Sequence, residues 1–235
     1  MPGTVLKGFD PGVARRRALW EIIADAMRRA IVLGDLPASL RLDEPALARK
    51  FGVSRVPVRE ALVRLEHEGL VRLQPHRGAF IIGLTEQDVR DLYELRQLIE
   101  RRAVRRAAGR IGPDGVACLR RLAERMDRAL RAGQPQAMVE PDVSFHRLLV
   151  AEAGSGQLLT AWERLAGLIG AMLEVTDLTY RGTPSPVHGH ERIIETLARR
   201  DGAAAEEEIR AHLENGEHVM REAMRALRAG GAAAG

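Results

Sequence analysis

The order of local signals between residues 40 and 83 constrains the fold of this chain more than any other feature. Asp43 is a favourable N-cap for a short helix, which Gly52 then ends. Ser54 is suited to cap a second helix, and Pro57 falls in the first turn of that helix, where a missing N–H group costs little. Two short helices joined by a tight turn are therefore expected.

The second of these helices has one apolar face and one cationic face. Its apolar residues recur at helical spacing and are expected to face the core: Val58, Ala61, Leu62 and Leu65. Gly69 ends the helix, and segments 70–73 and 78–82 have the composition of two strands joined by a turn. Helix, turn, helix and hairpin in this order are typical of a winged helix-turn-helix.

The distribution of charge favours a nucleic-acid partner for this segment. Residues 1–82 contain 14 Lys and Arg against 9 Asp and Glu, a net charge of +5, whereas the rest of the chain has a net charge of −1. A positive field attracts phosphate groups. An arginine-rich helix alone more often marks a solvated surface, so the interpretation as a DNA reader depends on the whole pattern.

The runs GVSRVPVREAL, RLEHEGLV and PHRGAFI resemble the GntR family of bacterial transcription regulators over roughly residues 15 to 83. This resemblance implies that the second helix of the motif enters the major groove of double-stranded DNA and that the hairpin is the wing. The DNA-binding residues that it implies are Ser54, Arg55, Val56, Pro57, Arg59, Arg64, His76, Arg77 and Gly78.

The chain after Gly83 has the periodicity of helices. Thr85 and Asp88 predict a capping box for a helix to about Gly109, with core positions expected at Val89, Leu92, Leu95, Leu98, Ile99 and Ala103. Further helices are expected at about 113–132, 135–153, 155–181, 186–200 and 203–228, and Pro141 is expected to break or restart the helix around it. The sequence thus predicts a mainly α protein: flexible residues 1–12, a winged helix-turn-helix at 13–83, an all-α bundle at 84–228 and a flexible tail at 229–235.

One aspartate and three histidines stand out in the predicted bundle. Asp142 and His146 are four residues apart on one helix, so both side chains project from the same face and could bind one metal ion. His190 and His212 belong to the two following helices, and helix bundles build metal sites from side chains on facing helices. A surface ion pair is the alternative for Asp142 and His146, and His188 is the alternative ligand to His190.

The segments DLYELRQLIE, DVSFHRLL, HERIIETL and DGAAAEEEIRAH resemble the FCD ligand-binding domain of FadR-type GntR regulators, over roughly residues 85 to 225. The resemblance implies that Asp142, His146, His190 and His212 hold a divalent ion, most simply zinc, with nickel or manganese as alternatives. It also implies that Arg96 receives the carboxylate of a small organic acid. The alternative is that Arg96 only pairs with Glu100 on a solvated helix.

We therefore expect a homodimeric, cytoplasmic regulator, most simply a repressor, which binds a pseudo-palindromic operator and responds to a small carboxylate or sugar acid. Cys118 is the only cysteine, which argues against a disulfide framework, and no apolar run reaches the roughly 18 residues of a membrane span. A metal-free pocket for an acyl or other ligand is the alternative on the same fold. A small metalloenzyme is disfavoured because four protein ligands leave little room for an activated water.

Overall fold

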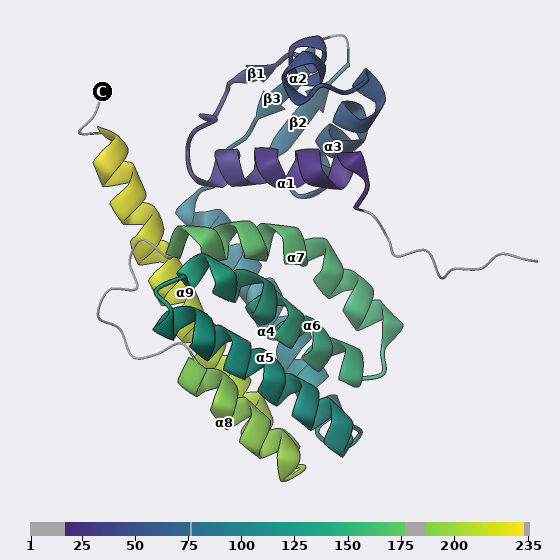
Figure 1. The fold of residues 1–235 in the computed structure, drawn as a ribbon, viewed down its shortest axis with the longest axis vertical. Coiled ribbons are helices and arrows are strands. Elements are labelled where there is room, and N and C mark those ends of the chain that lie inside the picture. Colours follow the sequence, from purple (N-terminus) through teal and green to yellow (C-terminus); the bar gives the residue numbers. More distant parts are fainter. Residues whose placement is uncertain (1–16, 76, 177–186, 233–235) are drawn as a thin grey trace, which may run out of the picture.

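The computed structural model describes residues 17–75, 77–176 and 187–232, arranged as a small N-terminal domain stacked on a larger helical one (Figure 1). The predicted flexible segment 1–12 lies outside the described residues. The elements of the N-terminal domain are α1 (Leu19–Val32), β1 (Arg41–Leu42), α2 (Glu44–Phe51), α3 (Arg55–His67), β2 (Val71–Gln74) and β3 (Gly78–Ile81).

The N-terminal domain is a winged helix-turn-helix, as the sequence predicts. Its three strands are antiparallel in the order β1-β3-β2, and in the wing Val71 lies opposite Ile81. Strand β1 was not predicted, because two residues carry too little pattern to be identified in a sequence. This short strand pairs along β3 and attaches the wing to the segment between α1 and α2.

The local signals of this domain act as expected. A carboxylate oxygen of Asp43 accepts a hydrogen bond from the backbone N–H of Ala46 at 2.7 Å. Gly52 and Gly69 have φ angles of +66° and +74°, a left-handed conformation that glycine adopts without strain. Ser54 occupies the N-cap position of α3, although its side chain makes no cap hydrogen bond to the described residues. The four predicted core residues of α3 are fully buried: Val58, Ala61, Leu62 and Leu65.

The described part of the C-terminal domain is helical throughout. Its elements are α4 (Glu86–Ala107), α5 (Pro113–Arg131), the 3₁₀ turn η1 (Pro135–Met138), α6 (Val139–Glu152), α7 (Gly156–Thr176), α8 (Val187–Ala198) and α9 (Gly202–Ala232). The capping box of Thr85 and Asp88 begins α4. Figure 1 shows α7 running beneath α1, between the N-terminal domain and the other helices of the bundle.

Two helices, α6 and α9, have boundaries that differ from those predicted from the sequence. Helix α6 begins at Val139 after η1, so Pro141 falls in its first turn, where a proline removes no intrahelical hydrogen bond. Asp142 and His146 consequently remain on one continuous helix. Helix α9 continues to Ala232, into the segment 229–235 that was predicted to be a flexible tail. Residues 233–235 lie outside the described part of the chain.

The predicted core face of α4 is wrong at two positions. Leu95 and Leu98 are 47% and 67% exposed. The buried side of the helix follows Leu92, Arg96 and Glu100 instead, because α6, α7 and α9 all pack against that side. An arginine and a glutamate thus occupy core positions, and two leucines lie on the outer surface.

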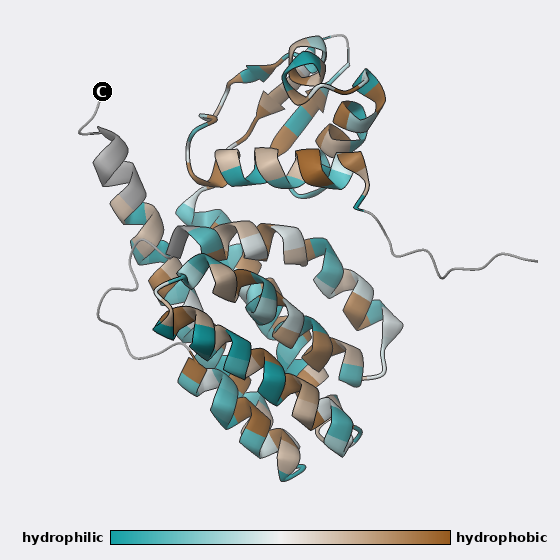
Figure 2. Cartoon of the chain, in the orientation of Figure 1, coloured by the Kyte–Doolittle hydropathy of each residue, from teal (hydrophilic) through white to brown (hydrophobic). Residues whose placement is uncertain are grey.

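Hydrophobic and hydrophilic residues alternate along the helices of both domains in Figure 2, as is usual for amphipathic helices that cover a core. Within the described residues, none of the helices combines the length and the apolar character needed to cross a membrane.

Candidate metal centre and nucleic-acid interface

The exposed side of α3 begins with a group of residues that the sequence assigned to DNA. Ser54, Arg55, Val56 and Arg59 are exposed there, and Pro57 is half-buried in the first turn. The backbone N–H groups of this turn point away from the helix, which is the arrangement that binds phosphate groups at helix N-termini.

The wing carries the remaining predicted DNA contacts. Arg77 is exposed in the turn between β2 and β3. Gly78 follows with a φ of +96°, which a residue with a side chain rarely adopts. His76, also assigned to DNA from the sequence, lies outside the described residues.

Arg64 lies near the C-terminal end of α3, away from Arg55 and Arg59. Its Nε donates to Glu68 at 2.7 Å, and its Nη2 lies 3.5 Å and 3.4 Å from the backbone carbonyl oxygens of Glu163 and Arg164 in α7. The guanidinium therefore faces the C-terminal domain. Arg64 is thus a contact between the domains, and the DNA contact expected for it from the sequence stays a prediction.

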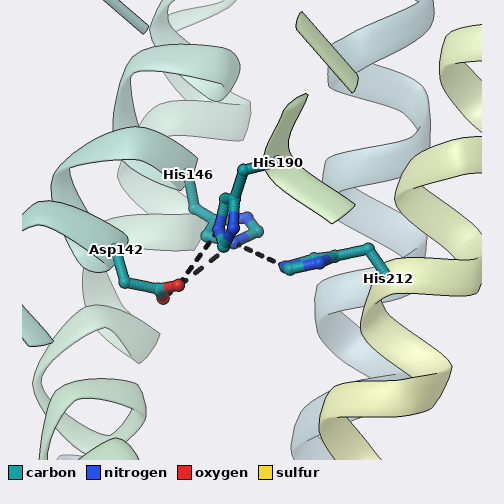
Figure 3. A group of neighbouring side chains, drawn as sticks. All are labelled: Asp142, His146, His190 and His212. Carbon is teal, nitrogen blue, oxygen red and sulfur yellow. Dashed lines mark hydrogen bonds and ion pairs between the residues drawn. The ribbon is translucent and has the colours of Figure 1, made fainter. Parts of the chain in front are cut away.

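The structure brings together the four residues that were assigned to a metal. Asp142 and His146 project from α6, His190 from α8 and His212 from α9, and one ligand atom of each lies within 4.8 Å of all the others (Figure 3). Nε2 of His146 lies 3.2 Å from Nε2 of His212, and Nε2 of His190 lies 3.1 Å from an oxygen of Asp142. Two ligands on one tetrahedral zinc ion, with bonds of about 2.0–2.1 Å, have their donor atoms roughly 3.3 Å apart.

A buried carboxylate orients one of these imidazoles. Nδ1 of His146 lies 2.5 Å from an oxygen of Glu100, which is 1% exposed. Burial alone would raise the pKa of Glu100, but the charges and hydrogen bonds of Arg96 and His146 hold this pKa well below its ordinary range. Because an ionised carboxylate only accepts, Nδ1 of His146 donates to it, which leaves Nε2 as the atom available to a metal ion.

The protonation states of the cluster also suit a metal ion. Burial, followed by the neighbouring His190 and His146, lowers the pKa of His212 well below its ordinary value, so its imidazole is neutral near pH 7. Burial would raise the pKa of Asp142, but the hydrogen bond with His190 and the surrounding imidazoles lower it below its usual range. A neutral imidazole and an ionised carboxylate are the forms that bind metal. One oxygen and three nitrogen donors therefore fit a divalent ion.

Arg96 borders a cavity of about 350 Å³ next to this cluster. Its Nε donates to Glu100 at 2.8 Å, so the pair expected as an alternative exists, but it is buried and not solvated. Nη2 of Arg96 is buried and has no hydrogen-bond partner among the described residues. Burial raises the pKa of Tyr93, which also lines the cavity, to about 12, so its phenol stays protonated. Arg96 and Tyr93 thus line the same cavity as the cluster.

Sequence reasoning missed two residues that support this site. Glu100 was predicted only as the ion-pair partner of Arg96. No role was predicted for Trp162, although its Nε1 donates a hydrogen bond to Glu100 at 3.0 Å. Polar residues at the core-facing positions 93, 96 and 100 of one helix were the available signal for Glu100. His188 and His218 line the cavity as exposed side chains and are not members of the cluster.

The fold defines a class of protein: a winged helix-turn-helix protein with a separate helical domain. Comparison with family models gives the particular family. Residues 19–81 match the bacterial regulatory proteins of the gntR family, and residues 91–215 match the FCD domain. The chain therefore belongs to the GntR family, in its group with a C-terminal FCD domain. Members of this family are transcription regulators and not enzymes.

Individual relatives agree with this assignment. The chain is 31% identical over 191 residues to the HTH-type transcriptional repressor RspR of Escherichia coli, covering 80% of this chain and 82% of that protein. It is 33% identical over 185 residues to the gluconate operon transcriptional repressor of Bacillus licheniformis, covering 76% and 75%. The structure of McbR/YncC of E. coli shares the fold, with a TM-score of 0.70, 18% identity and coverage of 88% and 99%.

Gly189 allows a test of the cluster that removes none of its ligands. A Cβ atom at this position would lie 2.6 Å from Nδ1 of His212, so Gly189→Ala has to displace that imidazole. We expect zinc affinity to fall by about 10–100-fold, as when an outer contact of a metal ligand is lost. Competition with a zinc-binding dye measures this change.

Gly156→Ala is the matched control, because a Cβ atom there meets nothing within 4 Å. Its zinc affinity should equal that of the parent. An unchanged affinity in Gly189→Ala would show that His212 is not a ligand.

Proposed function

We propose that this regulator is a dimeric repressor whose affinity for DNA is controlled by a small organic acid, bound beside a divalent metal ion in the C-terminal domain. The observation that carries the proposal is the arrangement around one cavity: four converging donor residues and the unpartnered Nη2 of Arg96. A carboxylate placed there can meet the metal ion and the arginine together.

The side chains around the cavity indicate which metal ion and which class of acid to expect. Three imidazoles and one carboxylate suit zinc best, and nickel and manganese also accept such ligands. The resident ion would supply a positive charge for the acid, while Arg96 and the phenol of Tyr93 would orient it by donating hydrogen bonds. The name of the relative from B. licheniformis refers to gluconate, which supports sugar acids as the first compounds to test.

Control of DNA binding follows from linkage. A ligand releases DNA only if it binds more tightly to the domain arrangement that binds DNA less well. Two relatives are named as repressors, which supports release of DNA as the response of this protein to its ligand.

The first prediction from this proposed function concerns the recognition helix. Arg59→Ala removes an exposed guanidinium from α3 without touching the core, so affinity for DNA should fall by about 1–3 kcal/mol with the fold unchanged. The measurement is a titration at fixed salt against a duplex selected by the parent protein from random-sequence DNA. Arg131→Ala is the control, since this arginine is 80% exposed on the C-terminal domain. Equal affinities of Arg59→Ala and the parent would remove Arg59 from the interface.

The second prediction concerns the dimer. Each chain has one recognition helix, so a pseudo-palindromic operator requires two chains. We propose that the outer face of α4, with its exposed Leu95 and Leu98, lies against the second copy. Leu98→Glu would bury a charge in that contact, and light scattering should show the mass halved. Ile22→Glu, a change at an equally apolar exposed site on α1, should remain a dimer. A dimeric Leu98→Glu would show that the interface lies elsewhere.

The third prediction concerns the metal. His190→Ala removes one imidazole that is far in sequence from the DNA-binding residues, so zinc affinity should fall by more than about 10-fold. Elemental analysis after equilibration with zinc measures the occupancy. A thermal-shift screen of small carboxylates and sugar acids, with and without chelator, measures the response to the acid.

His188→Ala is the matched control, because His188 lines the same cavity outside the cluster. It should keep both the zinc and the response. Equal zinc content in His190→Ala and the parent would overturn the metal site. A response that survives the chelator would instead favour a metal-free pocket.

A further inference from the structure

Glu100 links the metal cluster to the helix on which the DNA-binding domain rests. Its carboxylate accepts from Nε of Arg96 at 2.8 Å and from Nε1 of Trp162 at 3.0 Å, and it holds Nδ1 of His146 at 2.5 Å. Trp162 belongs to α7 and is fully buried. A shift of His146 therefore acts on one oxygen of a carboxylate whose other oxygen is hydrogen-bonded to Trp162 of α7.

The opposite side of α7 contacts the DNA-binding domain. The residues that follow Trp162 in the chain, Glu163 and Arg164, offer their backbone carbonyl oxygens to Nη2 of Arg64 at 3.5 Å and 3.4 Å. Arg64 lies near the end of α3, the same helix that carries Arg59. A chain of direct contacts therefore runs from a metal-ligand imidazole to the recognition helix.

A second contact fixes α7 closely to the same domain. A Cβ atom at Gly167 would lie 2.9 Å from Cζ of Arg28, so the α7 backbone lies almost against this guanidinium. Arg28 is buried and forms a two-pronged ion pair with Glu68, at 2.6 Å and 2.9 Å. Glu68 also accepts from Arg64. The close approach at Gly167 thus packs α7 against a guanidinium of α1 that is itself paired with the residue at the end of α3.

We infer that the hydrogen bond between Trp162 and Glu100 couples the metal cluster to the recognition helix, with Arg64 as the contact on the far side of α7. Trp162 and Arg64 are positioning residues in this scheme, and neither belongs to the metal cluster. The inference rests on the proposed metal site. It adds the route by which occupancy of that site changes the stability of α3.

Hydrogen exchange with zinc as the probe tests this coupling. Exchange of the α3 amides is measured in zinc-loaded and chelator-treated protein, and zinc content is measured by elemental analysis. In the parent, zinc should change the exchange rates in α3 by roughly 5-fold or more, the lower range of coupling between sites. Trp162→Phe keeps the ring packing but loses the N–H donor. It should bind the same amount of zinc and lose this change.

Arg64→Met breaks the other end of the path without entering the core, and it should give the same result. Arg147→Met is the matched control. Arg147 also contacts Glu163, through the side chain at 2.6 Å, but lies away from the domain boundary. This control should retain the full effect of zinc on α3.

Three results would overturn the inference: an undiminished zinc effect in Trp162→Phe and Arg64→Met, loss of zinc from Trp162→Phe, or a zinc-loaded parent with no change in α3. A parent that binds no zinc would overturn the proposed metal site as well. Elemental analysis separates this last outcome from the other three.

Discussion

The carboxylate of Glu100 lies in the interior, where an isolated charge is destabilising by several kcal/mol. Nitrogen atoms from three packed helices offset this penalty. Arg96 comes from the same helix, His146 from α6 and Trp162 from α7, and each places a nitrogen at one of the two oxygens. The pKa of Glu100 stays low, so the charge is retained and is not neutralised by protonation. Any movement of α6 or α7 relative to α4 would leave the carboxylate with fewer donors. The position of this carboxylate is therefore tied to the packing of α4, α6 and α7.

The sequence predicted most of the DNA-binding domain because its signals are local. A cap at Asp43 and left-handed glycines at 52 and 69 act within a few residues, so no tertiary information is needed to interpret them. Helical spacing and resemblance to a family together indicated the four candidate metal ligands, which the structure brings together. The contact of Trp162 with Glu100 spans 62 positions of the chain and arises only from the packing of α7 against α4. No pattern along the sequence could reveal it.

Helix α4 shows why a correct helix can be assigned an incorrect face. Its leucines at 95 and 98 fit a predicted apolar stripe but are exposed. The side of the helix that is buried contains Arg96 and Glu100. Hydrophobic periodicity predicts that the leucines are buried, because the method assigns apolar residues to the core and charged residues to the surface. Positions at which a sequence departs from such a rule tend to be functional. Here the departure places the polar groups at the cavity and leaves the leucines for the proposed contact with a second chain.

The two ends of α3 then have different tasks. The N-terminal turn presents Arg55 and Arg59 to solvent, whereas Arg64, close to the C-terminal end, contacts α7. A helix of 13 residues is rigid over its length, so a displacement at one end is carried to the other. The contact of Arg64 gives the helix that carries Arg55 and Arg59 a direct connection to the C-terminal domain.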